Sequence, residues 1–97
     1  MRESALQKKC LDWVKKEYEG AVLAVNIHGG GYSNKGFPDL IVFGNQKAIV
    51  VELKADSGYK LQPDQIIWRN RFVVAGINHY VTKKFDEFKD IVRKEFQ

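Results

Sequence analysis

Residues 39–54, with the sequence DLIVFGNQKAIVVELK, decide the fold of this chain. The runs 39–43 and 48–54 are rich in β-branched residues and are separated by the polar residues 44–47, so the stretch predicts a β-hairpin. Residues 48–51 are apolar at four successive positions, which is typical of a central strand covered on both faces. The hairpin is therefore expected to form the middle of a sheet.

The sequence on either side of the hairpin predicts three helices and two further strands. Apolar residues recur with helical spacing over 3–18, and Pro63 is typical of the first residue of a helix. The expected elements are a helix over 3–18, a strand over 21–27, a loop over 28–38, the hairpin, a loop over 55–62, a helix from Pro63 that Gly76 ends, a strand over 77–81 and a last helix capped by Thr82. This order, α-β-β-β-α-β-α, predicts the α/β class, with a small mixed β-sheet of about four strands flanked by helices.

Length, charge and cysteine content exclude several classes of protein. The 97 residues suffice for a single domain over 1–97, and 44% of them are hydrophobic, which excludes intrinsic disorder of the whole chain. No apolar run approaches the roughly 20 residues that a membrane-spanning helix needs. The single cysteine, Cys10, excludes an internal disulfide framework, and because the first residues do not form a signal peptide we expect an intracellular, cytoplasmic protein. The net charge of +4 suits a polyanionic partner.

Two carboxylates of the hairpin are expected to oppose one another. If residues 45–46 form a two-residue loop, Asp39 lies directly across from Glu52, with the two Cβ atoms about 4.5–5.5 Å apart. Like charges at this distance repel, and a bound divalent cation would remove the repulsion. Lys54 shares the face of Glu52, where it can hold a water or a phosphate. The alternative is an interstrand Lys–Glu pair at the mouth of the sheet, without a chemical role.

Two helical residues are candidates to complete this site. Glu3 lies on the same helical face as Leu6 and Cys10, so it either frays with the first turn or supplies a third carboxylate. Gln65 shares a stripe with Trp68 on the second helix. It is either an exposed amide at the helix start or a group that orients Lys54 or a bound phosphate.

Several short motifs together resemble a known family of nucleases. They are Gly36-Phe37-Pro38-Asp39-Leu40, Val51-Glu52-Leu53-Lys54-Ala55, Gln62-Pro63-Asp64-Gln65, Ala75-Gly76, Tyr80 and Val81. In this order and spacing the chain resembles the VRR-NUC domain, the virus-type replication-repair branch of the PD-(D/E)xK nuclease superfamily. The resemblance extends from Glu3 to Val81. One departure is Gln62 before the second helix, where Ser or Thr is expected.

The resemblance implies a metal-dependent DNA endonuclease. By position, Asp39 and Glu52 would bind Mg²⁺ or Mn²⁺ together with the backbone carbonyl of Leu53. Lys54 would position the attacking water, and Glu3 and Gln65 would complete the catalytic set. Small stand-alone members of the family are typically phage-encoded homodimers that cut branched DNA such as four-way junctions, which implies a bacterial host cytoplasm. The expected products carry a 5′-phosphate and a 3′-hydroxyl.

Further residues are candidates for contacts with DNA and with a second copy of the chain. Basic residues in the loops and on the second helix are expected to contact phosphates; they are Lys35, Lys60, Arg69 and Arg71. Val73 and Val74 are either core residues or part of a dimer interface, because they stand beside charged neighbours. Two other functions remain open, a nucleic-acid-binding module without turnover and a nicking or restriction-type nuclease with another substrate.

Overall fold

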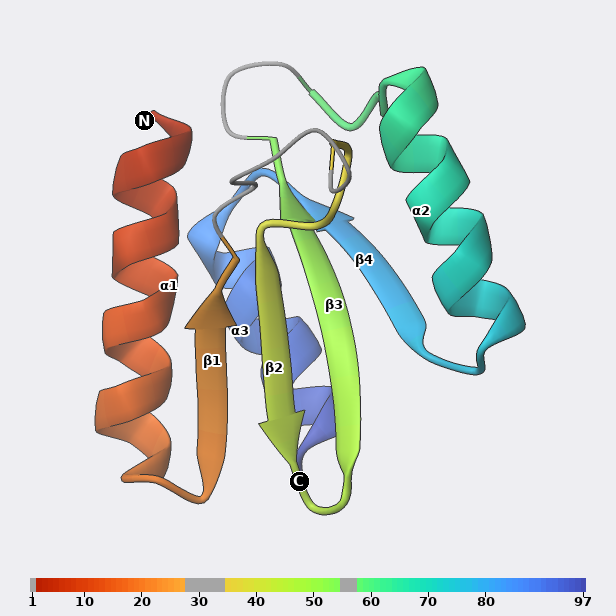
Figure 1. Cartoon of the computed structure of the whole chain (residues 1–97). Helices are drawn as coiled ribbons and strands as arrows, with labels where there is room; N and C mark the ends of the chain where they lie inside the picture. The colour runs from red at the N-terminus through yellow and green to blue at the C-terminus, as the bar shows by residue number, and fades with distance from the viewer. Residues whose placement is uncertain (1, 28–34, 55–57) are drawn as a thin grey trace.

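A four-stranded sheet flanked by three helices forms the computed structural model of the chain, which describes residues 2–27, 35–54 and 58–97 (Figure 1). The elements are α1 (Glu3–Tyr18), β1 (Val22–Asn26), β2 (Leu40–Gly44), β3 (Lys47–Leu53), α2 (Pro63–Val74), β4 (Asn78–Thr82) and α3 (Phe85–Glu95). The predicted order α-β-β-β-α-β-α and the mixed sheet are confirmed. Parts of the two expected loops, residues 28–34 and 55–57, lie outside the described residues.

The sheet has the strand order β1-β2-β3-β4. The first three strands are antiparallel, and β4 is parallel to β3 because α2 carries the chain back across the sheet. Asn45 and Gln46 have φ angles of 49° and 64°, as a two-residue turn with a type I′ backbone requires. This turn sets the register that pairs Gly44 with Lys47 and Leu40 with Val51. The predicted hairpin and its register are therefore confirmed.

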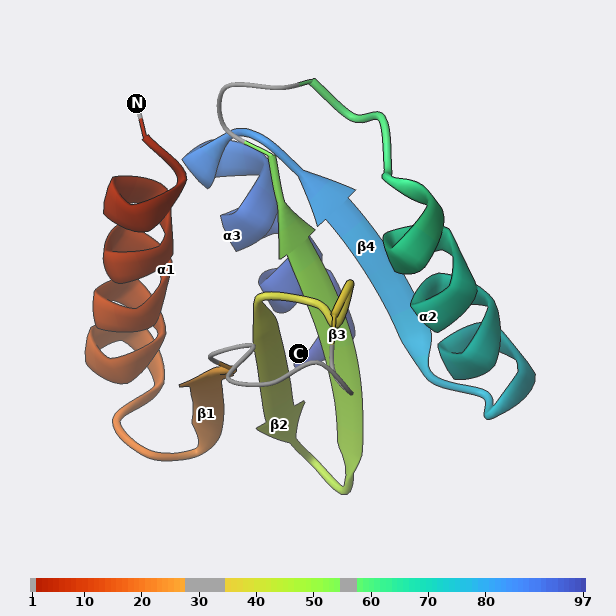
Figure 2. The ribbon, with the colours of Figure 1, turned by 45° about the horizontal axis from the view of Figure 1, so that its top comes forward.

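The core lies between one face of the sheet and the helices α1 and α3 (Figure 2). Its fully buried members come from every one of these elements; they include Leu6, Cys10, Leu40, Val42, Ile49, Val51, Phe88 and Val92. Helix α2 lies on the opposite face and packs against β4. Because β3 is covered on both faces, Val50 on the α2 side is as buried as its neighbours. No helix in the described ranges is long and apolar enough to cross a membrane.

The predicted boundaries at the C-terminal end were partly wrong. The last strand begins and ends one residue later than expected, at Asn78 and Thr82, and α3 begins only at Phe85. Thr82 is therefore not the N-cap of α3. Its hydroxyl instead donates a hydrogen bond to Oε1 of Glu87, 2.7 Å away. The carboxylate of Glu87, in the first turn of the helix, fixes this corner in place of a hydroxyl cap.

Candidate active site

Four elements bring their ends together at one end of the sheet. Helices α1 and α2 begin there, β2 begins there, and β3 ends there (Figures 1 and 2). The candidate residues Glu3, Asp39 and Glu52 belong to three of these ends, although they are far apart in the sequence. The antiparallel pairing of β2 with β3 is the cause, because the start of one strand then lies beside the end of the other.

Asp39 is the residue immediately before β2, one step beyond the pair Leu40–Val51. Continuing the same register places it opposite Glu52, as the sequence predicted. Its Oδ2 atom accepts a hydrogen bond of 2.7 Å from the backbone N–H of Leu53. This bond anchors the Asp39 carboxylate across the end of β3, where it lies close to the Glu52 side chain.

Glu52 and Lys54 are buried charged residues on the α2 side of β3, with 4% and 6% of their surface exposed. The Oε1 atom of Glu52 is buried and has no hydrogen-bond partner among the described residues. The pKa of Glu52 is raised to about 9, and burial, which is costly for a carboxylate, is the largest cause. A hydrogen bond with Asp39 and the negative charges of Asp39 and Glu3 contribute to this rise, whereas the positive charge of Lys54 opposes it.

Glu3 is the first residue of α1, and its side chain is exposed. Its negative charge is the smallest of the contributions that raise the pKa of Glu52. The start of α1 therefore lies on the side of the molecule where Glu52 is found. As these side chains lie, the described part of the chain has no group of three or more His, Cys, Asp or Glu residues arranged to hold a metal ion. Asp39 and Glu52 are the two carboxyl groups of the hairpin that face one another.

Gln65 lies in the first turn of α2, where its Oε1 atom accepts a hydrogen bond of 2.8 Å from the backbone N–H of Gln62. This bond pairs one of the backbone groups that a helix start leaves unsatisfied. In return, the side chain of Gln62 accepts a hydrogen bond from the backbone N–H of Gln65, so Gln62 itself takes the place of the expected Ser or Thr in a capping box. The arrangement agrees with the reading of Gln65 as an amide at the helix start.

A contact that the sequence did not predict ties the Asp39 loop to α2. Gly36 has a φ of 86°, and a Cβ atom at this position would lie 2.5 Å from the backbone carbon of Asp64. The next residue, Phe37, packs edge-on against Trp68 and Phe72, with ring centroids 4.8 and 5.4 Å apart. Only glycine permits this approach, so the Gly-Phe pair positions the loop that leads into Asp39.

The four candidate DNA-binding residues lie on the surface of the protein. Lys35 is exposed and forms an ion pair with Asp64, with 3.4 Å between Nζ and Oδ2. The guanidinium of Arg71 lies over the ring of Trp68, 4.7 Å from its centroid. Lys60 and Arg69 are also exposed, which leaves all four side chains accessible to a phosphate backbone.

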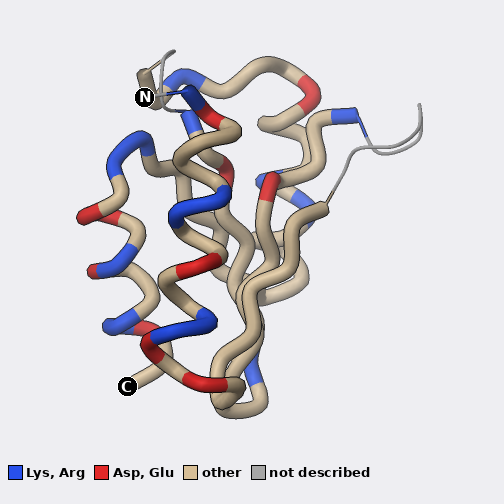
Figure 3. The backbone as a smooth tube through the Cα atoms, turned by 90° about the vertical axis from the view of Figure 1, so that its left-hand side faces the viewer, with Lys and Arg blue, Asp and Glu red and all other residues tan. Residues whose placement is uncertain are grey.

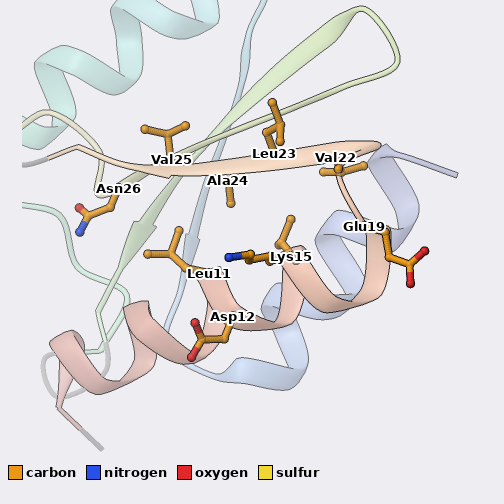
Figure 4. Close-up of a pocket in the computed structure, with 11 residues that line it drawn as sticks. Leu11, Asp12, Lys15, Glu19, Val22, Leu23, Ala24, Val25 and Asn26 are labelled. Carbon is orange, nitrogen blue, oxygen red and sulfur yellow. The ribbon is translucent and has the colours of Figure 1, made fainter.

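A cavity of about 710 Å³ lies away from this end of the sheet, between α1 and the edge strand β1 (Figure 4). Its lining is mostly apolar and includes Leu11, Val14 and Ala24. The charged residues that line it on α1, Asp12 and Lys15, are not among the residues that act on Glu52. Figure 4 shows both of them on the α1 side of the cavity. We therefore place the candidate active site at the carboxylates rather than at this cavity.

The fold resembles a solved structure described as "VRR_NUC domain". The two chains share 23% sequence identity and superpose with a TM-score of 0.68, over 94% of this chain and 98% of the other. No protein-family model and no curated protein matches the sequence. The likeness confirms that the chain has the fold of a VRR-NUC domain, as its motifs predicted.

The raised pKa of Glu52 predicts how the stability of the metal-free protein depends on pH. Between the ordinary value of 4.5 and about 9 the folded protein retains a proton that the unfolded chain has lost. The free energy of unfolding should therefore fall as pH rises through this range. The equilibrium constant for unfolding should increase by up to about tenfold per pH unit. Glu52→Gln should remove this component.

Thermal or urea unfolding in EDTA, at several pH values between 5 and 9, measures the effect. The difference between the wild type and Glu52→Gln isolates Glu52 from other groups. His79 is one such group, because burial is the chief cause that lowers its pKa. The unfolded chain therefore binds a proton at His79 more readily than the folded protein does, so the contribution of His79 to the free energy of unfolding rises with pH near neutrality. Parallel stability curves for the two proteins would show that Glu52 titrates normally.

Proposed function

We propose that this chain is a metal-dependent DNA endonuclease that hydrolyses phosphodiester bonds in branched DNA. The observation that carries the proposal is the buried Glu52 carboxyl group, which faces Asp39 and has an oxygen without a partner. A purely structural role would be expected to satisfy that oxygen. The likeness in fold to a VRR_NUC domain supports the same function.

The donors at this site fit a hard divalent cation. Carboxylate and carbonyl oxygens are the ligands that Mg²⁺ and Mn²⁺ prefer. Asp39 and Glu52 would hold the ion, with the backbone carbonyl of Leu53 as a further ligand. The buried Oε1 of Glu52, which has no hydrogen-bond partner among the described residues, is an oxygen of this kind, and a cation would also offset the repulsion that contributes to the raised Glu52 pKa.

When bound, such a cation neutralises phosphate charge and lowers the pKa of a water molecule. The chain's own residues would orient the reactants around it. Lys54 is buried beside Glu52, so its ammonium group is held at the site and would stabilise negative charge that develops on the phosphate. Glu3 would accept a hydrogen bond from water at the outer side of the site, and Gln65 would keep the start of α2 in place.

The decisive experiment compares DNA structures under matched conditions. Purified protein is incubated with a four-way junction, a flap, a linear duplex and a single strand, in Mg²⁺ and in EDTA, and the labelled products are separated by electrophoresis. We expect Mg²⁺-dependent cleavage that favours the junction and leaves 5′-phosphate ends. Binding without cleavage would instead identify a non-catalytic nucleic-acid-binding module. Equal cutting of duplex and junction, or isolated nicks, would identify a nuclease with another substrate.

The basic residues around the site are proposed to bind the phosphate backbone without reading bases. Replacing Lys35, Lys60, Arg69 or Arg71 by Ala should weaken binding to every DNA sequence alike. Each change should also reduce the slope of log K against log salt concentration by roughly one unit. Fluorescence anisotropy over a salt series measures both effects. A change in sequence preference would contradict the proposal for the residue concerned.

Symmetric cutting of a four-way junction needs two active sites in a fixed relation. One copy of this chain supplies one such site, so we propose that it acts as a homodimer, the commonest closed assembly.

A further inference from the structure

Helix α2 carries an apolar outer face in addition to the face that it turns toward the protein. Trp68 and Phe72 lie on its inner side, in contact with Phe37. On the outer side, four residues at helical spacing form what we call the helix patch; they are Ile66, Ile67, Val73 and Val74, exposed by 36%, 51%, 61% and 88%. The alternative that Val73 and Val74 are core residues is therefore wrong. A helix that is apolar on both sides is usually buried on both.

The other two helices do not share this property. Figure 3 shows charges of both signs distributed along α1 and α3, which is typical of a solvated surface. On α2 the charged residues Arg69 and Arg71 border the helix patch on its two sides instead of interrupting it. Asn70 lies between the pair Ile66–Ile67 and the pair Val73–Val74, and it is the one polar residue of the outer face.

A second apolar surface lies on the same side of the sheet as α2. Leu23, Val25 and Phe43 form this sheet patch, and they are exposed by 56%, 47% and 42%. Their strands β1 and β2 send alternate residues into the core, so these three face the other way. Figure 4 shows Leu23 and Val25 pointing away from α1. Helix α2 covers the β4 side of this face, and no other described helix lies on it (Figures 1 and 2).

We propose that two copies of this chain form a reciprocal dimer in which the helix patch of each copy packs on the sheet patch of the other. This inference deepens the homodimer of the proposed function and rests on it. The twofold axis runs along the strands, and the two α2 helices lie side by side between two facing sheets. Each α2 then contacts its own β4 with one side and the partner's β1 and β2 with the other.

The dimensions of the fold agree with this arrangement. Four strands about 4.8 Å apart present a face roughly 15–20 Å wide, and a helix with its side chains is about 10 Å across. The chain's own α2 fills about half of that width, which leaves room for one more helix. An apolar sheet face is buried when another element packs on it, and a helix is one such element.

The exposed area agrees with what a stable dimer needs. At about 100 Å² for a fully exposed aliphatic side chain, the helix patch and the sheet patch together leave roughly 400 Å² of apolar surface on each copy. A stable interface buries about 800 Å² per partner, of which slightly more than half is apolar. A contact between the two helix patches alone would bury little more than half of the apolar surface that a stable interface needs. The reciprocal arrangement buries both patches and is therefore favoured.

The direction of the axis has a consequence for catalysis. Rotation about an axis parallel to the strands does not reverse them, so both candidate active sites would lie at the same end of the dimer. One branched DNA molecule could then meet both sites from one side. An axis across the strands would place the sites at opposite ends.

Sedimentation velocity at micromolar concentration tests the interface with one variant in each patch. The wild type should sediment as a dimer, and Val74→Glu in the helix patch and Val25→Glu in the sheet patch should each sediment as a folded monomer, as circular dichroism will verify. Gln97→Glu introduces the same charge outside both patches and should remain dimeric. A monomeric wild type, or a dimeric Val25→Glu, would overturn the reciprocal interface.

A mixture of complementary variants tests which patches meet. Val74→Lys and Val25→Glu should each be monomeric alone, and a 1:1 mixture should restore dimers, because one contact becomes Lys–Glu and the other is wild type. Failure of the mixture to dimerise overturns the proposal. If the wild type is a monomer that still cuts junctions, the proposed interface is wrong and the proposed nuclease function stands. If the wild type is a dimer, both variants are monomers and no DNA is cut, the interface stands and the nuclease function is wrong.

Discussion

Replacing either facing carboxylate should abolish Mg²⁺-dependent cleavage while the protein remains folded. We expect Asp39→Asn and Glu52→Gln each to reduce the rate by about a thousandfold or more, because a metal ion supplies several kcal/mol of transition-state stabilisation. Both substitutions preserve size, and Asn can still accept the hydrogen bond from the backbone N–H of Leu53. Single-turnover cleavage of a junction in Mg²⁺, together with circular dichroism, measures the two properties separately.

The matched control is Asp12→Asn, which changes an exposed carboxylate whose ion pair is with Lys8 on the same helix. It should cut at the wild-type rate. A second expected difference concerns the metal-free protein, in which Glu52→Gln removes a carboxyl group that burial and neighbouring carboxylates disfavour in its charged form. Its melting temperature in EDTA at pH 8 should therefore exceed that of the wild type. Full cleavage activity in either site variant would remove these residues from the candidate metal site.

The hairpin and the opposition of its carboxylates could be predicted because local rules determine them. A two-residue loop fixes which residues pair, and the alternation of side chains then fixes their faces. For that reason the sequence alone places Asp39 opposite Glu52, and the register of β2 and β3 agrees. Glu3 could be placed near them only as one of two alternatives, because helical spacing gives a direction but not the packing angle of α1.

The contacts between separate segments were harder to predict. Nothing local indicates that Gly36 lies against the backbone of Asp64, since a glycine before Phe-Pro also suits an ordinary turn. The start of α3 was misplaced because Thr82 is a good cap by type, whereas its hydroxyl bonds to Glu87 from the end of β4. Helix α2 was ambiguous because apolar residues on two sides leave open which side faces the protein.

Lys54 should affect turnover far more than affinity. The residue is almost fully buried at the end of β3 and interacts with Glu52, so in the proposed complex it would contact only a phosphate bound at the candidate site. One lysine is a small part of a surface that contacts many phosphates. Lys54→Ala should therefore bind a four-way junction within about twofold of the wild type and cleave it about 100- to 1,000-fold more slowly, the usual effect of losing one electrostatic contact to the transition state.

Lys35→Ala is the matched comparison, because Lys35 is exposed and its partner is Asp64 rather than the carboxylates of the site. Its loss should weaken binding and leave the single-turnover rate at saturating protein unchanged. Affinity is measured by fluorescence anisotropy with Ca²⁺ in place of Mg²⁺, and the rate by rapid mixing with Mg²⁺. Equal losses of affinity and rate in Lys54→Ala would make Lys54 a DNA-binding residue. Opposite patterns in the two variants would separate the lysine that acts on the reacting phosphate from one that holds the DNA.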